Sequence, residues 1–134
     1  MRVVLKIISS VLLLVNGIGA LWGGANLLRD TSGKSMGWSL EMLAHTPFSD
    51  YFIPGLILFI SNGLFSLFVF LLLLFGNRKY PLLLFAQGAI LIGWIMIQVL
   101  MLRTFIQLHL IMLLIGIALA ICGWKLNARR FKVN

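Results

Sequence analysis

The amino-acid sequence predicts an all-α integral membrane protein whose four helices form a bundle. Hydrophobic residues make up 61% of the 134 residues and charged residues only 10%, with a mean hydropathy of +1.07. A soluble domain carries about 25% charged residues, so most of the outer surface must contact something apolar. Long apolar stretches also recur at about the 20 residues that cross a bilayer as a helix. No repeat or linker divides the chain, and residues 1–134 are expected to form a single domain.

The first apolar stretch spans about residues 4–28. Its start is similar to a signal peptide, because Arg2 and Lys6 precede an apolar run that reaches small residues at Gly19 and Ala20. The apolar run continues well past these small residues, however. We therefore interpret the stretch as a retained transmembrane helix.

The second apolar stretch spans residues 51–75 and is bounded by helix-capping signals. Ser49 or Asp50, just before it, suits an N-cap, and Gly76, just after it, suits a C-cap. Pro54 falls in the first turn, where proline is tolerated. These signals predict one membrane-spanning helix.

The last apolar stretch begins at Pro81, a favoured first helical position, and is too long for one crossing. As one helix it would measure about 65 Å at 1.5 Å per residue, twice the hydrocarbon thickness of about 30 Å. The chain must therefore fold back, and Arg103 and Thr104 near the middle mark the turn. This predicts helices over residues 81–101 and 105–124.

Lys and Arg residues are distributed unevenly between the two ends of the predicted bundle. Eight of the eleven fall on the side of the termini: Arg2, Lys6, Arg78, Lys79, Lys125, Arg129, Arg130 and Lys132. Only Arg29, Lys34 and Arg103 fall on the other side. Positive charges concentrate in cytoplasmic segments, so we predict a multi-pass protein of the cell membrane with both termini in the cytoplasm.

The predicted topology leaves one substantial external segment, residues 29–50. Its first half is rich in turn-forming residues, and its second half, from about residue 39 to 45, suits a short helix. We expect Trp38, Leu40, Leu43 and Ala44 to face the membrane interface, where tryptophan is a typical anchor. The fold prediction therefore includes a short interfacial helix between the first two spans.

Polar and aromatic residues gather at this same external end. The predicted topology places seven of them there, from the loop and from the two helices that meet near residue 103: Glu41, Asp50, Trp94, Gln98, Arg103, Gln107 and His109. Polar groups in lipid are costly and usually face a cavity or a partner. The seven are therefore candidate ligand-binding residues. Glu41 or Asp50 would pair with a cation or with Arg103, and Gln98 and His109 would supply hydrogen bonds.

Several of these residues also have a purely structural interpretation. The Arg103 side chain can extend to the lipid headgroups from its helix end. Gln98 and Gln107 can bond each other across the hairpin, and His109 can be a satisfied interhelical histidine. The histidines and acids show no metal-ligand spacing, so no metal site is predicted. Cys122 is the only cysteine, which excludes an internal disulfide.

Two amides fall near the middle of adjacent predicted helices. An unpaired amide at Asn16 or Asn62 would cost several kcal/mol in an apolar environment. We therefore expect both to face the interior, bonded to each other in preference to a ligand. Small residues that allow close helix contact recur in the first and fourth spans: Gly17, Gly19, Ala20, Gly23, Gly24, Gly116, Ala120 and Gly123.

The sequence argues against several classes of function. Its positive charges flank apolar runs and form no stripe on a soluble fold, which argues against nucleic-acid binding. It contains no nucleophile elbow, phosphate-binding loop or zinc-protease motif. We favour a non-enzymatic or at most accessory protein over an enzyme, and we predict no cofactor. It would bind membrane lipid, a lipophilic small molecule or a partner membrane subunit through its external half. An oligomeric pore or transporter is an alternative.

The loop and its flanks carry a recognisable set of motifs. They are Gly23-Gly24, Leu27-Leu28-x-Asp30, Ser32-Gly33, Gly37, Thr46-Pro47-Phe48, Asp50-Tyr51 and Pro54-Gly55, followed by Trp94 and Gln98. With these motifs the chain, from about residue 17 to 124, resembles a group of small, mostly uncharacterised bacterial four-helix membrane proteins. That group is distantly similar to the DoxX-type proteins. The resemblance implies a bacterial inner-membrane protein. As an alternative function it implies a membrane subunit of a quinone-linked oxidoreductase, with Gln98 and His109 bonding a quinone carbonyl.

Overall fold

Four long apolar helices run through the described part of the chain. The computed structural model describes residues 1–103 and 107–133, and every regular element in these ranges is helical. The elements are α1 (Arg2–Arg29), η1 (Lys34–Met36), η2 (Leu40–Leu43), α2 (Phe52–Ile57), η3 (Leu58–Leu64), α3 (Phe65–Leu74), α4 (Tyr80–Leu102) and α5 (Gln107–Val133). The prediction of an all-α fold with four long apolar helices is confirmed.

These helices are long enough to cross a membrane. α2, η3 and α3 follow one another directly and together form the second long helix. The apolar parts of the four helices measure 28, 23, 21 and 22 residues, and at 1.5 Å per residue each exceeds the hydrocarbon thickness of about 30 Å. Large apolar side chains such as Ile18, Phe68 and Leu114 are exposed on the bundle surface. The chain is a multi-pass membrane protein.

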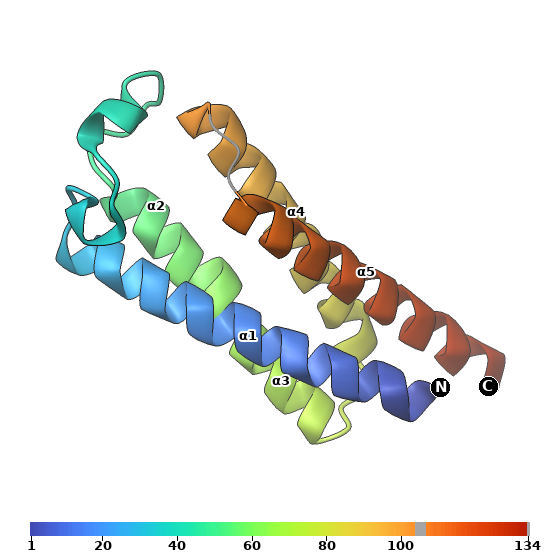
Figure 1. Ribbon diagram of the computed structural model, residues 1–134. Helices are drawn as coiled ribbons and strands as arrows, with labels where there is room; N and C mark the ends of the chain where they lie inside the picture. Colours follow the sequence, from blue (N-terminus) through green and yellow to red (C-terminus); the bar gives the residue numbers. More distant parts are fainter. Residues whose placement is uncertain (104–106, 134) are drawn as a thin grey trace.

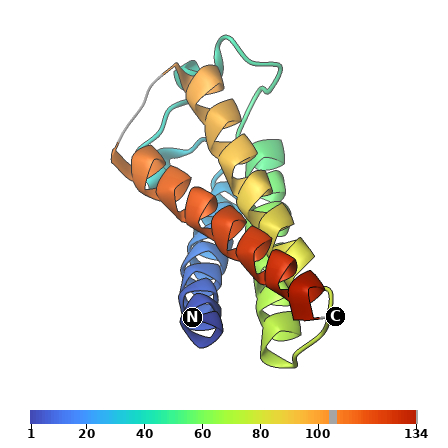
Figure 2. The same cartoon turned by 90° about the vertical axis from the view of Figure 1, so that its right-hand side faces the viewer.

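The helices form two hairpins that lie against each other. α1 packs along α2, η3 and α3, and α4 packs along α5. Both termini and the link between α3 and α4 lie at one end of the bundle (Figures 1 and 2). The loop between α1 and α2, residues 30–51, lies at the opposite end together with the end of α4. There the two hairpins diverge, and η2 of the loop reaches α4.

The helix ends follow local sequence signals. Directly after α3, Gly76 adopts the left-handed conformation with φ 70°, which glycine allows without strain. Arg103 follows α4 and is also left-handed, with φ 53°, a conformation that is costly for a residue with a side chain. α4 thus ends one residue beyond the predicted 101. Thr104 and the predicted helix start at 105–106 lie outside the described residues.

α5 extends further than predicted. The predicted helix ends at residue 124 with the apolar run, whereas α5 continues to Val133. No glycine or proline follows Gly123, and the Lys, Arg, Ala and Leu residues beyond it are good helix formers. The length of an apolar run determines what crosses a bilayer but not where a helix stops. The helix therefore carries the basic C-terminal residues beyond its apolar part.

The interior contains two apolar clusters with a polar layer between them. Toward the termini, α1, α3, α4 and α5 contribute residues without exposed surface: Leu13, Val69, Leu84 and Leu119. Toward the loop, the buried cluster consists of Leu27, Leu43 and Tyr51. Between the two clusters along the helices lie four fully buried polar residues: Asn16, Asn62, Ser66 and Gln87.

The two mid-helix asparagines face the interior, as predicted, but they do not bond each other amide to amide. Asn16 Nδ2 donates to Ser66 Oγ at 2.7 Å and lies 3.5 Å from the backbone oxygen of Asn62. Asn62 Oδ1 instead accepts a hydrogen bond of 3.2 Å from Gln87 Nε2. The prediction missed Ser66, one helical turn after Asn62 on the same long helix, and Gln87, which lies on a third helix and cannot be paired from sequence spacing alone.

Small residues bring the backbones of each hairpin close together. A Cβ atom at Gly24 would lie 2.8 Å from Phe59 Cβ and 2.9 Å from the backbone oxygen of Gly55. A Cβ atom at Gly88 would lie 2.5 Å from the backbone nitrogen of Ala120. Gly19, by contrast, has open space around it. Most of the small residues predicted to mediate packing therefore do so, within and not between the hairpins.

Two glycines of α4 allow a matched test of this packing. Gly88→Ala should destabilise the protein by about 1–3 kcal/mol, because the added methyl group clashes with the backbone of α5. Gly93→Ala, with no atom within 4 Å of the added Cβ, should leave stability unchanged or raise it by up to about 1 kcal/mol through helix propensity. Reversible unfolding in mixed micelles measures both, and equal effects would contradict the proposed contact.

Candidate functional site

The loop at the open end of the bundle begins with a turn organised by Asp30. One carboxylate oxygen accepts hydrogen bonds from the hydroxyl and the backbone N–H of Ser32. The other oxygen accepts the backbone N–H of Ser35 at 3.0 Å. These hydrogen bonds, that from the Ser32 hydroxyl foremost, lower the pKa of Asp30 below its ordinary value, because they favour the charged carboxylate. Asp30 therefore fixes the path of the chain as it leaves α1.

Tyr51 ties the end of the loop to its start. Its backbone N–H donates to the carbonyl of Thr31 at 2.9 Å, and its hydroxyl donates to the carbonyl of Ser39 at 2.8 Å. Its ring packs on Trp38, with 5.5 Å between the ring centroids. Gly33 has φ 80°, and a Cβ there would lie 2.7 Å from the Tyr51 ring. Burial raises the pKa of the Tyr51 hydroxyl, which keeps it protonated as a donor.

Leu43 is the residue through which the loop enters the bundle. It ends η2, is only 3% exposed and belongs to the buried cluster with Leu27 and Tyr51. The expectation that it faces the membrane interface is therefore wrong. The hairpins diverge at this end, and Leu43 fills the apolar space between them, where its side chain is removed from water. The predicted short helix is present as the single 3₁₀ turn Leu40–Leu43.

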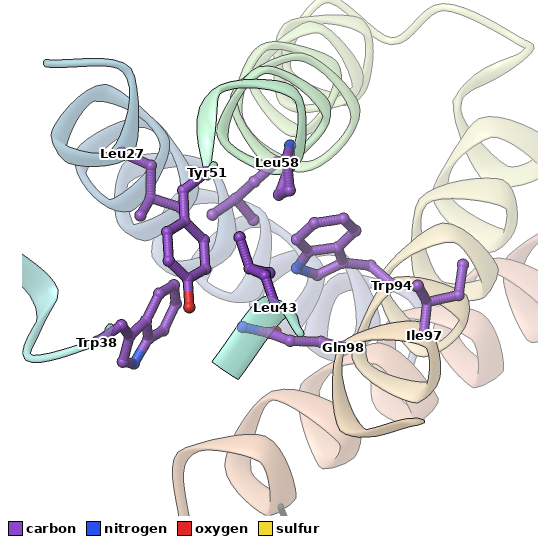
Figure 3. A pocket seen from close by; sticks show the side chains of 9 residues that line it. Leu27, Trp38, Leu43, Tyr51, Leu58, Trp94, Ile97 and Gln98 are labelled. Atoms are coloured by element: carbon purple, nitrogen blue, oxygen red, sulfur yellow. The ribbon is translucent and has the colours of Figure 1, made fainter. Parts of the chain in front are cut away.

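A small apolar pocket lies beside Leu43, between the two hairpins (Figure 3). Its lining comes from α1, the loop, α2, η3 and α4: Leu27, Trp38, Leu43, Tyr51, Pro54, Leu58, Trp94, Ile97 and Gln98. The cavity volume is about 30 Å³, enough for a water molecule but far below the roughly 300–1,000 Å³ of small-molecule pockets. A ligand larger than water therefore requires lining side chains to move.

The pocket combines an apolar wall with a few groups that form hydrogen bonds. Figure 3 shows Trp94 and Gln98 extending from α4 toward Leu43, with Trp38 and Tyr51 on the opposite side. The Gln98 amide can both donate and accept, whereas each indole N–H only donates. Such a lining suits an apolar chain that ends in a hydrogen-bonding group.

The structure brings two of the seven predicted site residues together. Trp94 and Gln98 line the pocket, one helical turn apart on α4. Gln107 is exposed and His109 is buried, both near the start of α5, and neither lines the pocket. Arg103 is exposed at the turn after α4.

The two acids of the predicted site have local roles or face outward. Asp50 Oδ1 accepts the backbone N–H of Phe52, the first residue of α2, at 3.1 Å. The N-cap itself is Tyr51, so the predicted N-cap at Ser49 or Asp50 is wrong. Glu41 is exposed on η2. Pairing of either acid with Arg103 is not seen among the residues that the structure describes.

Most of the pocket lining was not predicted as a site. Leu27, Leu43, Leu58 and Ile97 resemble ordinary core or lipid-facing residues in the sequence, because an apolar wall has no distinctive residue type. A usable signal was Trp38, an aromatic residue that the sequence already placed at the membrane interface of this end.

The described residues, 1–103 and 107–133, contain no group of three or more His, Cys, Asp or Glu side chains that could hold a metal ion. Their pocket also presents no nucleophile beside a base. No protein-family model, curated protein or solved structure matches this chain. Its activity must therefore be inferred from the residues of the pocket itself.

The Asp30 turn predicts a pH dependence of the loop. Because the pKa of Asp30 is lowered in the folded protein, its stabilising effect is present above the unfolded pKa of 3.8 and is lost as the pH falls through the folded value. Amide exchange in residues 31–38, corrected for the intrinsic rate, should accelerate several-fold from about pH 5 to about pH 2. Asp30→Asn should remove this difference, and an unchanged corrected rate in the wild type would contradict the prediction.

Proposed function

We propose that this multi-pass membrane protein binds a lipophilic molecule at the loop end of the bundle and acts by binding without catalysis. The supporting observation is the apolar pocket between the diverging hairpins, lined by the buried Leu43 and by Gln98 among others. The ligand class follows from this lining. An alkyl or isoprenoid chain matches the leucine wall, and a polar headgroup matches Gln98 and the indoles.

Access to the pocket runs from the side of the bundle. Ile97 lines the pocket and is also 51% exposed on the outer face of α4. α2 and α4 diverge at this end, where η2 of the loop contacts α4 (Figures 1 and 2). A chain already dissolved in the bilayer can therefore reach the pocket past Ile97 without crossing water.

Binding would exchange one apolar contact for another. The methylenes of the ligand take the volume of Leu43, and η2 moves outward as a short unit. Because the ligand comes from an equally apolar bilayer, its methylenes replace the contacts of Leu43 without a gain from leaving water, and the hydrogen bond of the headgroup with Gln98 supplies the favourable free energy. Gly37 has φ 74° and open space around it, which makes it a suitable pivot for η2.

A quinone is a specific member of this ligand class. Its isoprenoid tail fits the apolar wall, and a ring carbonyl can accept a hydrogen bond from Gln98. The position of Gln98 in the pocket favours this second candidate function, a membrane subunit of a quinone-linked oxidoreductase. His109, its expected partner on the quinone, is outside the pocket lining.

The orientation of the protein follows from its charges. Eight of the eleven Lys and Arg residues belong to the termini and the α3–α4 link, which share one end of the bundle (Figure 1). Under the positive-inside rule that end faces the cytoplasm, in the inner membrane of a bacterium. The pocket then opens near the external surface, at the depth of the outer lipid headgroups.

A photoactivatable phospholipid with a diazirine on its acyl chain tests the binding site in nanodiscs. Peptides containing Leu43, Leu58 or Ile97 should be labelled above the level of exposed surface residues such as Ile18 and Leu114. Labelling of the pocket no stronger than that of the outer surface would overturn the proposal. Cross-linking of this end to another membrane protein would instead indicate a partner subunit.

Two glutamines provide a matched pair for the headgroup contact. Gln98→Leu should lower pocket labelling about 2- to 10-fold, because one hydrogen bond contributes about 0.5–1.5 kcal/mol and 1.4 kcal/mol corresponds to a factor of ten. Gln107→Leu changes the same residue type at the same end, outside the pocket lining, and should leave labelling unchanged. Equal effects of the two substitutions would exclude a specific contact of Gln98.

Single cysteines test the orientation. Ser35→Cys in the loop should react with a membrane-impermeant maleimide in intact cells, whereas Asn77→Cys in the α3–α4 link should react only after permeabilisation. The native Cys122 is buried and serves as the internal background in the unmodified chain. Reaction of both introduced cysteines from the same side would contradict the topology.

A further inference from the structure

Four neutral polar side chains meet at the centre of the bundle, away from the pocket. Asn16 comes from α1, Asn62 from η3, Ser66 from α3 and Gln87 from α4, and none of them has exposed surface. They form the polar layer between the two apolar clusters. Such groups are costly in an apolar interior unless every donor and acceptor has a partner.

Two side-chain oxygens of this layer have no hydrogen-bond partner among the described residues. Asn16 uses its nitrogen on Ser66, and Gln87 uses its nitrogen on Asn62. Asn16 Oδ1 and Gln87 Oε1 are buried and accept no hydrogen bond from the residues that the structure describes. Rotating either amide only exchanges an unpartnered oxygen for an unpartnered NH₂ group. One polar atom of each amide therefore lacks a hydrogen-bond partner in either orientation of the side chain.

The backbone is irregular at the same place. η3, Leu58–Leu64, is a π-helical turn, and the N–H of Phe65 bonds the carbonyl of Ile60, five residues earlier. Asn62 lies in this turn, with its backbone oxygen facing the Asn16 amide at 3.5 Å. π-helical turns within α-helices are frequent at functional sites. The irregular turn and the two unpartnered oxygens are separate observations that point to the same position.

We propose that this polar layer is an internal water-binding site, in which bound water donates hydrogen bonds to Asn16 Oδ1 and Gln87 Oε1. The open groups are amide oxygens, and rotation of an amide would replace them with NH₂ groups, so the ligand must be able both to donate and to accept hydrogen bonds, as water does. The three acids of the chain, Asp30, Glu41 and Asp50, all lie in the loop, so no charge at the layer compensates the desolvation of a cation. An apolar molecule would leave both oxygens unsatisfied.

The bound water would connect the two hairpins. Asn16 belongs to the first hairpin and Gln87 to the second. The Asn16 amide faces the backbone oxygen of Asn62, and the Gln87 amide donates to Asn62 Oδ1. Water bound at their free oxygens adds a polar contact between the two hairpins. This site is separate from the ligand pocket, and its existence does not depend on what that pocket binds.

Water-edited solid-state NMR on the wild-type protein in bilayers tests the site directly. With Asn and Gln side chains isotopically labelled, magnetisation from water should reach the Asn16 and Gln87 amides at short mixing times. The methyl groups of Leu13 and Leu84, which are equally buried, serve as the dry reference. Transfer to the two amides as slow as to these methyl groups would overturn the proposal.

A variant tests whether the two oxygens share the water. Gln87→Leu should reduce the water signal at Asn16 several-fold, whereas Gln107→Leu, on the exposed start of α5, should not change it. An undiminished signal at Asn16 in Gln87→Leu would exclude a shared site. Should Gln87→Leu fail to fold, the wild-type measurement still decides the proposal.

A salt series separates water from a metal cation. The thermal midpoint of the wild-type protein should be the same in sodium, potassium and choline chloride at equal concentration. A rise that is specific for sodium or potassium, and that Asn16→Leu abolishes, would show a cation site and overturn the assignment to water.

Discussion

Close backbone contact at small residues is the constraint on which the rest of this structure depends. Lipid is as apolar as a leucine side chain, so helices in a bilayer gain little from burying apolar surface and associate mainly through tight packing. The glycine contacts, such as Gly24 with Gly55 and Gly88 with Ala120, all lie within a hairpin. The two hairpins are therefore well-packed units, and they meet through side chains. Where side chains no longer bridge them, they diverge.

The divergence explains both the loop and the pocket. The diverging hairpins leave apolar side chains uncovered at one end of the bundle, and Leu43 of the loop packs against them. Met36, Trp38 and Phe48 of the loop pack against the same buried cluster, and polar contacts hold the loop at its edges. The Asp30 carboxylate fixes its start, and Tyr51 joins its end to Thr31 and Ser39. The loop is thus held at its edges by hydrogen bonds and at its centre by Leu43, the side chain that a ligand would have to displace under the proposed function.

The polar groups of the interior fall into two different environments. Gln98 borders the pocket, where an exchangeable ligand can satisfy it. Asn16, Asn62, Ser66 and Gln87 are enclosed on all sides and can be satisfied only by each other or by a small molecule trapped with them. A side-chain amide therefore has different roles at the pocket near the loop and in the buried layer at the centre of the bundle. At the pocket, Gln98 would contact the proposed ligand, and at the centre of the bundle the amides join three helices.

The sequence by itself determined the four apolar helices, the turn near Arg103 and the inward position of Asn16 and Asn62, because apolar length and the cost of a buried amide act locally along the chain. It also indicated Trp94 and Gln98 as residues of interest. Only the tertiary structure decided that Leu43 points inward, that Gln87 is the partner of Asn62, and that Gln107 and His109 lie outside the pocket. These facts depend on how the two hairpins meet, which is decided by side-chain contacts between segments far apart in the chain and has no periodic signal in the sequence.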